Sequence, residues 1–259
     1  GSLGHHFWDF LVVLGSDENS VPACTGALFW VFWGTRNWSF SGISWRALLW
    51  LRGNLPGNDA IGHNRYSTTG GTTLRNIQPF FADTNAGGIG VSHNGNLTNA
   101  ITLRKKLVED GAIFYSTSDT ETIVQLIAKS KRKKTIDKIV DALFQIQGGY
   151  ALVMLTKNTL IGVRDPFGIR PLVIGKLKNS YIFASETCAL DIIGAKSIRD
   201  VENGEIVYIE NNELKSIKPF PLKKPRPCVF EYIYFARPDS ILNGQIGRAH
   251  VWTPVTVRS

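Results

Sequence analysis

The sequence predicts an α+β fold in which antiparallel sheets carry helices on their outer faces. Three observations predict it: short apolar runs typical of strands come first, three amphipathic segments follow, and a series of hairpins completes the body of the chain. Elements that are segregated along a chain in this way form antiparallel sheets with helices packed against them. The 259 residues, of which 43% are hydrophobic and 19% charged, are enough to bury the core of such a fold.

Strands are expected on both sides of the helical segment. Residues 60–67 and 88–93 precede it. The later strands pair into hairpins around short polar turns that contain Asn or Lys. These hairpin strands are residues 150–156, 160–164, 171–175, 181–185, 205–210 and 213–217.

Three helices are expected between these two groups of strands. Residues 96–110 place apolar side chains on one face, as an amphipathic helix does. Ser118 with Glu121 three residues later is a capping-box pattern, which predicts the start of a second helix. Thr135 is the predicted cap of a third helix, which a pair of glycines ends.

The two ends of the chain differ in composition from its body. Six of the seven tryptophans lie in the first fifty residues, and the seventh, Trp252, lies in the tail. One interpretation is an aromatic binding surface. The other is that residues 1–54 are an out-of-frame, non-native segment in which stop codons are read as tryptophan. Residues 246–255 are what a common sequencing adapter encodes when TGA is read as tryptophan, so we expect residues 246–259 to be an artefactual tail.

The net charge of +8 is concentrated in two basic clusters, residues 129–134 and 223–226. A nucleic-acid patch is one interpretation. The other is that the first cluster ends a helix, where cations suit the helix dipole and the solvent. Neither an aromatic platform nor a nucleic-acid motif accompanies the clusters, so we expect no nucleic-acid partner.

Membrane spans and disulfides are not expected. The apolar runs at residues 7–14 and 26–33 are too short to cross a bilayer. Cys24, Cys188 and Cys228 have neither paired nor metal-type spacing, which indicates a reducing cytoplasm.

Four residues carry groups that suit an amino-acid substrate. Arg65 lies at the end of a predicted strand, where its guanidinium suits a carboxylate. Asn94 and Gly95 follow an apolar run and can give two donors to one developing oxyanion. Asp119 lies at a predicted helix start and could hold a substrate ammonium. Taken singly, Arg65 is more often part of a surface ion pair and Asn94-Gly95 is far more often a tight turn, while the ordinary role of Asp119 is a helix cap.

Residues 56–240 resemble the glutaminase domain of the glutamine phosphoribosylpyrophosphate (PRPP) amidotransferase family. The stretches that carry the resemblance are GNDAIGHNRYSTTG, QPF, SHNGNLTNA, STSDTE, GVRDPFGIRPL, ASETCALDIIGA and EYIYFARPDS. The last three favour this family over glucosamine-phosphate synthase and asparagine synthetase, which carry the same type of glutaminase.

The resemblance implies an Ntn-hydrolase fold, an αββα sandwich of two antiparallel sheets between helical layers, with a disrupted amino-terminal part. It assigns residues 55–230 to a class II glutamine amidotransferase domain. Residues 231–245 would begin the connection to a missing phosphoribosyltransferase domain, and residues 231–240 would be a strand that leads into it. Arg164, Asp165 and Arg170 would belong to the face that meets that domain.

The resemblance also implies roles for the four candidate residues. Arg65 would hold the glutamine carboxylate and Asp119 the amino group, while the Asn94 side chain and the Gly95 N–H would form the oxyanion hole. The family's nucleophile is an amino-terminal cysteine whose own α-amino group is the base. This chain begins with Gly1, and no matching cysteine is found. Cys24 is a poor candidate, because it lies too close to Arg65 and the residues after it match badly, and Cys188 is expected to be a buried structural thiol.

The implied activity is hydrolysis of glutamine, with the ammonia used to make 5-phosphoribosylamine from PRPP in de novo purine synthesis. The full-length enzyme would be a cytoplasmic pentosyltransferase and a homo-oligomer. It would use Mg²⁺ and could carry a 4Fe–4S cluster with Cys228 as one ligand. For this chain alone we expect no cofactor and no activity.

Two alternatives remain open from the sequence. The first is the glutaminase of another class II amidotransferase. The second is a non-catalytic module that binds glutamine without a nucleophile.

Overall fold

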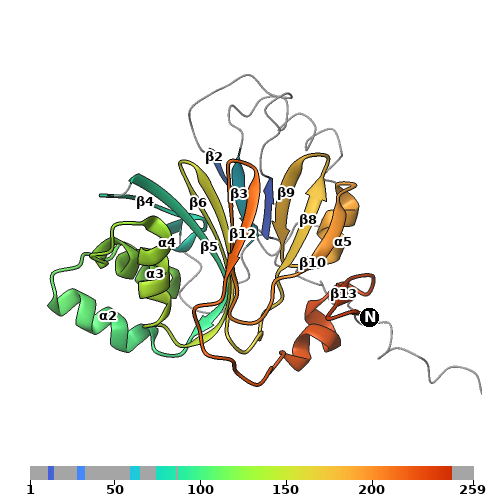
Figure 1. Cartoon of the computed structure of the whole chain (residues 1–259). Coiled ribbons are helices and arrows are strands. Elements are labelled where there is room, and N and C mark those ends of the chain that lie inside the picture. The colour runs from blue at the N-terminus through green and yellow to red at the C-terminus, as the bar shows by residue number, and fades with distance from the viewer. Residues whose placement is uncertain (1–10, 15–27, 33–58, 65–73, 86, 247–259) are drawn as a thin grey trace, which may run out of the picture.

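The computed structural model describes residues 11–14, 28–32, 59–64, 74–85 and 87–246. Two six-stranded sheets form the centre of the molecule (Figure 1). Three helices cover one side of this pair of sheets, and a fourth helix lies at the other side (Figure 1). The predicted αββα arrangement is therefore confirmed.

The first sheet has the strand order β12-β11-β7-β6-β5-β4, and every neighbouring pair is antiparallel. Asn211 and Asn212 have φ of 51° and 60° and form the turn of one predicted hairpin. Asn tolerates this left-handed region better than most residues. The strands are β4 (Phe80–Thr84), β5 (Gly87–Leu97), β6 (Gly148–Thr156), β7 (Thr159–Arg164), β11 (Ile206–Glu210) and β12 (Glu213–Ile217).

The second sheet has the order β10-β8-β9-β1-β3-β2. All of its pairs are antiparallel except β2 with β3, which run parallel. The strands are β1 (Leu11–Leu14), β2 (Leu28–Phe32), β3 (Ala60–Asn64), β8 (Val173–Leu177), β9 (Ser180–Ala184) and β10 (Lys196–Asp200). Of the segment predicted to be non-native, residues 1–54, only β1 and β2 are described, and its origin stays a prediction. Trp30 lies in β2, whereas the other six tryptophans lie outside the described residues.

The bounds of the helices differ from the prediction where residues make contacts with other elements. They are α2 (Ala100–Glu109), α3 (Asp119–Lys129), α4 (Thr135–Leu143) and α5 (Thr187–Ile192), with a short 3₁₀ turn at Leu74–Asn76. The predicted helix at residues 96–110 starts later than expected, because Asn96 and Leu97 continue β5 and pair with β6. Ser118 caps α3 as predicted. Glu121 does not complete the capping box, since its carboxylate accepts the N–H groups of Tyr115 and Ser116 instead.

Three apolar clusters join the four layers. Leu152 and Met154 of β6 belong to a cluster with the apolar faces of α3 and α4. The alternate residues Ala151 and Val153 belong to a second cluster that fills the space between the sheets, which is the period-two pattern of a strand buried on both faces. A third cluster lies between the second sheet and α5, where Leu190 is fully buried.

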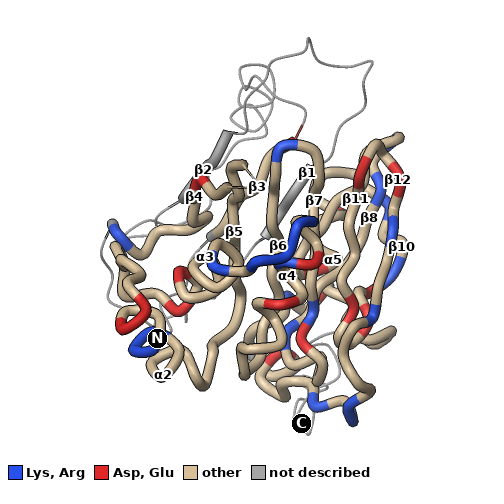
Figure 2. The backbone as a smooth tube through the Cα atoms, turned by 60° about the vertical axis from the view of Figure 1, so that its left-hand side comes forward, with Lys and Arg blue, Asp and Glu red and all other residues tan. Residues whose placement is uncertain are grey.

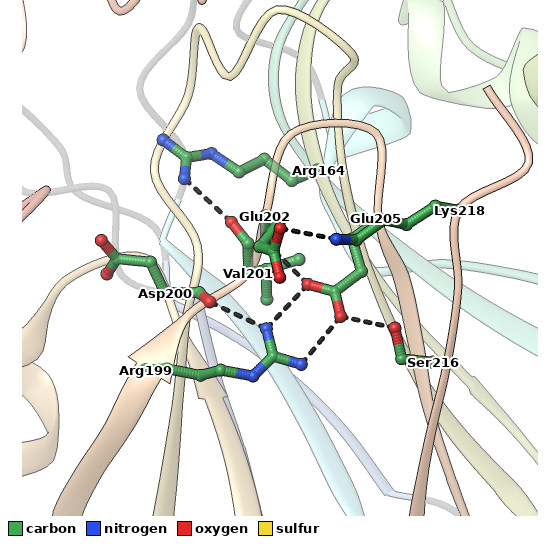
Figure 3. Close-up of polar contacts among 8 residues, drawn as sticks. All are labelled: Arg164, Arg199, Asp200, Val201, Glu202, Glu205, Ser216 and Lys218. Atoms are coloured by element: carbon green, nitrogen blue, oxygen red, sulfur yellow. Dashed lines mark hydrogen bonds and ion pairs between the residues drawn. The ribbon is translucent and has the colours of Figure 1, made fainter. Parts of the chain in front are cut away.

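A buried polar network ties the segment after β10 to the first sheet (Figure 3). Glu205 accepts two hydrogen bonds of 2.7 Å from the Arg199 guanidinium, and its carboxylate also accepts from the Ser216 hydroxyl and the Glu202 N–H. Burial raises the pKa of Glu205, but these donors outweigh burial and hold the pKa below its ordinary value. The carboxylate is therefore ionised at neutral pH and links β10 to β12.

The segment after residue 230 is helical where a strand was expected. Residues Glu231–Phe235 form one π-type turn, which the N–H of Ala236 closes onto the Glu231 carbonyl. The prediction of a strand over residues 231–240 was wrong, since residues Glu231–Phe235 are helical. The Glu231 carboxylate lies 2.7 Å from the Arg170 guanidinium. A small hairpin of β13 (Ile241–Leu242) and β14 (Gln245–Ile246) follows.

The first basic cluster begins at Lys129, the last residue of α3, and continues into the connection to α4, as predicted for the end of a helix (Figure 2). Within the described ranges, no helix is long and apolar enough to cross a membrane.

Candidate active site

The candidate site is built on the end of β5, where Asn94 and Gly95 lie opposite Ala151 and Tyr150 of β6. Gly95 has a φ of 136°, and a Cβ at this position would lie 2.1 Å from the carbonyl oxygen of Gly149. Only glycine therefore fits here. The sequence-based alternative of a tight Asn-Gly turn was wrong, since both residues lie within a continuous strand.

The N–H of Gly95 points to the edge of β5 that faces away from β6. On that edge the His93 N–H donates to Gln78 Oε1 at 2.7 Å, and the Leu97 N–H donates to Asp119 Oδ2 at 2.9 Å. Alternate residues of a strand direct their N–H groups to the same side. Since Gly95 lies between His93 and Leu97, its N–H is directed to the same edge, beside Asp119.

Asp119 is the first residue of α3, and its side chain is almost completely buried. Its Oδ1 lies 3.6 Å from His93 Nδ1. Burial raises the pKa of Asp119, but the His93 ring, the Leu97 N–H and the backbone N–H of Asp119 itself outweigh burial, so the pKa lies below its ordinary value. Ser118 rather than Asp119 accepts the capping hydrogen bond of the helix. A buried, ionised carboxylate is therefore left next to the edge of β5, where it can hold a substrate ammonium.

Asn94 offers the other half of the predicted oxyanion hole. The residue is 2% exposed, and its Oδ1 lies 2.9 Å from His63 Nε2 on β3. Its Nδ2 has no hydrogen-bond partner in the structure as described. An unsatisfied buried donor costs about 1–3 kcal/mol, and such groups in native proteins call for a specific explanation. A ligand oxygen that accepts a hydrogen bond from Asn94 Nδ2 would satisfy this donor.

The remaining sequence-predicted catalytic residues are placed as follows. Arg65 and Cys24 lie outside the described residues. Cys188 is buried on α5, as predicted for a structural thiol, and burial raises its pKa to about 12. A thiol with that pKa is protonated at neutral pH and is a poor nucleophile. Cys228 is partly exposed in the segment before the π-type turn.

Arg164 and Asp165, which were expected on an interface with another domain, have side chains that face inward. The Arg164 guanidinium donates to the carbonyls of Gly168, Arg170 and Val201. The Asp165 carboxylate accepts four backbone N–H groups, those of Tyr150, Phe167, Ile169 and Arg170. Both side chains therefore hold the loop after β7 in shape. Only Arg170 reaches the segment after residue 230, through Glu231 and the Phe235 ring.

Sequence reasoning missed three residues that shape the site: His63, His93 and Gln78. Each lies within a stretch that carries the family resemblance, so its place in that stretch was a signal that could have found it. Their contacts depend on strand register and on packing between layers, which motif spacing does not contain.

The comparisons with known proteins cover this same region. A family model described as "Glutamine amidotransferase domain" matches residues 63–191. The amidophosphoribosyltransferase of Rhizobium etli is 54% identical over 196 residues, which cover 74% of this chain and 40% of the relative. Amidophosphoribosyltransferase 1, chloroplastic, of Arabidopsis thaliana is 49% identical over 192 residues, which cover 74% of the chain and 34% of the relative.

The chain carries the glutamine amidotransferase domain of the amidophosphoribosyltransferase family. A solved structure of glutamine PRPP amidotransferase from B. subtilis, complexed with ADP and GMP, has a TM-score of 0.69 and 41% identity, covering 74% of this chain and 42% of that one. A structure described as the allosteric regulatory enzyme of purine biosynthesis has a TM-score of 0.72 and 34% identity, covering 92% of this chain and 48% of that one. The chain thus spans about two fifths of the length of the first curated relative.

Proposed function

We propose that, in the full-length enzyme, this domain hydrolyses glutamine to glutamate and ammonia, and that the ammonia serves the synthesis of 5-phosphoribosylamine from PRPP in de novo purine synthesis. The observation that carries the proposal is a buried amide donor without a partner, Asn94 Nδ2, beside a buried ionised carboxylate, Asp119. The similarity to proteins named amidophosphoribosyltransferase supports the same assignment.

The proposed pocket matches the charges of a zwitterionic amino acid. Asp119 holds the α-ammonium, and Arg65 holds the α-carboxylate through its planar fork of donors. With both ends held, the side-chain amide of glutamine reaches Asn94 and Gly95. Their two N–H donors stabilise the oxyanion that develops when a nucleophile attacks the amide carbon.

The chemical step is acyl transfer through a cysteine. A thiolate attacks the amide carbon, the C–N bond breaks, and the leaving nitrogen takes a proton and departs as ammonia. Water then cleaves the thioester to release glutamate. Cys188 and Cys228 do not fit the nucleophile, and Cys24 matches the expected surroundings badly. We therefore propose catalysis for the full-length enzyme and inactivity for this chain alone.

The other parts of the assignment concern the full-length protein. We propose a cytoplasmic pentosyltransferase that binds PRPP with Mg²⁺ and forms a homo-oligomer. Residues 55–230 are the proposed domain, 231–245 begin the connection to the next one, and 1–54 and 246–259 are proposed to be non-native.

Among the described residues, Cys228 is the one proposed as a possible ligand of an iron–sulfur cluster. A cluster needs four ligands, and within the described part of the chain no group of three or more His, Cys, Asp or Glu side chains could hold a metal ion. The described residues therefore do not form a cluster site, and Cys228 could serve only with ligands from elsewhere.

Glutamate release from glutamine by the full-length enzyme, with and without PRPP, tests the proposal. We expect glutamate release, and transfer of the ammonia to PRPP. Glutamate release that PRPP neither accelerates nor couples to a product indicates another class II amidotransferase. Glutamine binding without any glutamate release indicates a binding module and contradicts the proposal.

A further inference from the structure

We propose that His63 is a positioning residue that holds the Asn94 amide in the orientation required of an oxyanion-hole donor. The inference rests on the proposed function, because it concerns the same site. His63 lies on β3 in the second sheet, and Asn94 lies on β5 in the first sheet. Their hydrogen bond of 2.9 Å therefore crosses the space between the two sheets.

The amide of Asn94 has two ends of opposite character, and only one of them can face an oxyanion. Oδ1 accepts hydrogen bonds and Nδ2 donates them. A rotation of 180° about the last side-chain bond exchanges the two positions with almost no change in shape. If Oδ1 occupied the place of Nδ2, it would repel the developing negative charge. Something must therefore select one orientation.

His63 makes that selection, because its Nε2 contacts Oδ1. An oxygen at 2.9 Å requires a proton on Nε2, so the ring must be either the Nε2–H tautomer or the imidazolium. With that proton in place, the flipped amide would set two donors against each other. With a bare Nε2, the flipped amide would be preferred instead. The protonation of one ring nitrogen thus decides which end of Asn94 faces the substrate.

Burial makes this selection stringent. His63 is 6% exposed, so water cannot easily replace a lost partner for Oδ1. On the opposite face of β5, His93 contacts Thr120 and Asp119 of α3, so it cannot take the place of His63. The oxyanion hole therefore depends on the first sheet for its donors and on the second sheet for their orientation.

Kinetics of glutamate release by the full-length enzyme test the proposal with His63→Leu, His63→Gln, Asn94→Ala and the double variant of His63→Leu with Asn94→Ala. Loss of one oxyanion donor lowers kcat by about 10²–10³-fold. An amide that faces the substrate only part of the time should lose less, so we expect His63→Leu to lower kcat about 10–100-fold, with KM little changed. His63→Gln should recover most of this loss, because the glutamine amide supplies an N–H near the position of Nε2. In the Asn94→Ala background, His63→Leu should have no further effect.

An unchanged kcat for His63→Leu overturns the proposal, and so does an equal loss in the wild-type and Asn94→Ala backgrounds. The ¹⁵N shift of His63 in the wild-type protein gives a test that needs no variant, in case His63→Leu does not fold. It should report a protonated Nε2, and a bare Nε2 overturns the proposal. If the wild-type enzyme releases no glutamate, the proposed function fails. If the wild-type enzyme releases glutamate and His63→Leu has the same kcat, only the positioning role fails.

Discussion

At the scale of single residues, Asp119 shows how a buried charge is kept available for a ligand. Its carboxylate is surrounded by the Leu97 N–H and the His93 ring, while the capping of α3 is left to Ser118. A residue that capped its own helix would have less capacity for a substrate. The separation of these two tasks between neighbours supports the proposed role of Asp119 at the glutamine ammonium, which the family resemblance implies.

We predict that Asp119→Ala raises the glutamine KM of the full-length enzyme about 10–100-fold, because a hydrogen bond to a charged group contributes about 1.5–3 kcal/mol. Arg65→Ala should act in the same direction. Steady-state glutaminase kinetics give both values. Asp137→Ala, at an exposed aspartate in the first turn of α4, is the matched control and should leave KM unchanged.

The pH dependence of KM follows from the direction of the Asp119 shift. Its folded pKa is depressed, so the carboxylate stays charged above its ordinary value of 3.8. Acid should therefore not raise KM through this group until the pH falls below about 3.8. An Asp119→Ala enzyme with the KM of the wild type would remove the assignment.

Asn94, Gly95 and Asp119 were proposed as site residues from the family resemblance, because each lies in a short stretch that the resemblance covers. The same reasoning could not find that His63 contacts Asn94. That contact joins two sheets, so it depends on how they pack. From the sequence alone the turn interpretation of Asn94-Gly95 was the favoured one, because Asn-Gly is a frequent turn dipeptide. In the structure Gly95 has a left-handed φ but lies within a strand.

At the scale of elements, the connection between β10 and β11 depends on Glu205. This buried carboxylate holds Arg199, Ser216 and the Glu202 backbone together (Figure 3). Removal of the Glu205 carboxylate would leave its hydrogen-bond donors without an acceptor in a region that water reaches poorly.

We predict that Glu205→Ala lowers the free energy of unfolding by about 3 kcal/mol, the lower end of the cost of breaking a buried ion pair, since Arg199 is partly exposed. Chemical denaturation measures the change. The control is Glu210→Ala, which breaks an exposed pair with Lys215 and should cost less than about 1 kcal/mol. Equal losses in the two variants would contradict the role of the network.

The contribution of Glu205 should also depend on pH in a defined direction. Its folded pKa is depressed, so its stabilisation is full above the ordinary value of 4.5 and is lost as the pH falls through the folded pKa. The stability difference between wild type and Glu205→Ala should therefore shrink below about pH 4.5.

Element boundaries show which local signals were reliable. The cap at Ser118 and the Asn211-Asn212 turn were predicted correctly. The predicted cap at Thr135 was wrong, since Thr135 is the first residue of α4 and Lys134 is its cap. The strands β4 and β10 and the six-residue helix α5 were missed. Such short elements are stabilised mainly by tertiary contacts, which the local sequence pattern does not predict.

At the scale of the whole molecule, the segment after residue 235 is attached to the rest of the fold by hydrogen bonds to Glu186. This buried carboxylate accepts the Arg237 N–H at 2.9 Å and the Ser240 hydroxyl at 2.6 Å. Thr187 adds a bond from the N–H of Ile241. Residues 237–241 are thus attached at the start of α5.

We predict that Glu186→Ala loosens this attachment, so that the amide of Arg237 exchanges its hydrogen about 10–100-fold faster, in keeping with about 1–3 kcal/mol for the loss of a buried acceptor. Hydrogen–deuterium exchange measures the rate. Glu213→Ala, at an exposed glutamate of β12, should leave it unchanged. An unaltered rate in Glu186→Ala would show that other contacts hold the segment.

Antiparallel sheets with helices on their outer faces were predicted from the pattern, because strands, helices and hairpins are segregated along the chain. The αββα order of layers was predicted from the family resemblance. Sheet membership did not follow. The pairing of β3 with β2 in parallel, and the bonding of β1 between β3 and β9, join segments that are distant in sequence. Local periodicity carries no information on such pairings.

The central claim is that Asn94 and Gly95 form the oxyanion hole of a glutaminase, and Asn94→Ala in the full-length enzyme tests it most directly. We predict that the kcat for glutamate release from glutamine falls by about 10²–10³-fold, while KM changes little, since the lost donor acts on the transition state. An Asn94→Ala enzyme that releases glutamate at the wild-type kcat would contradict the claim.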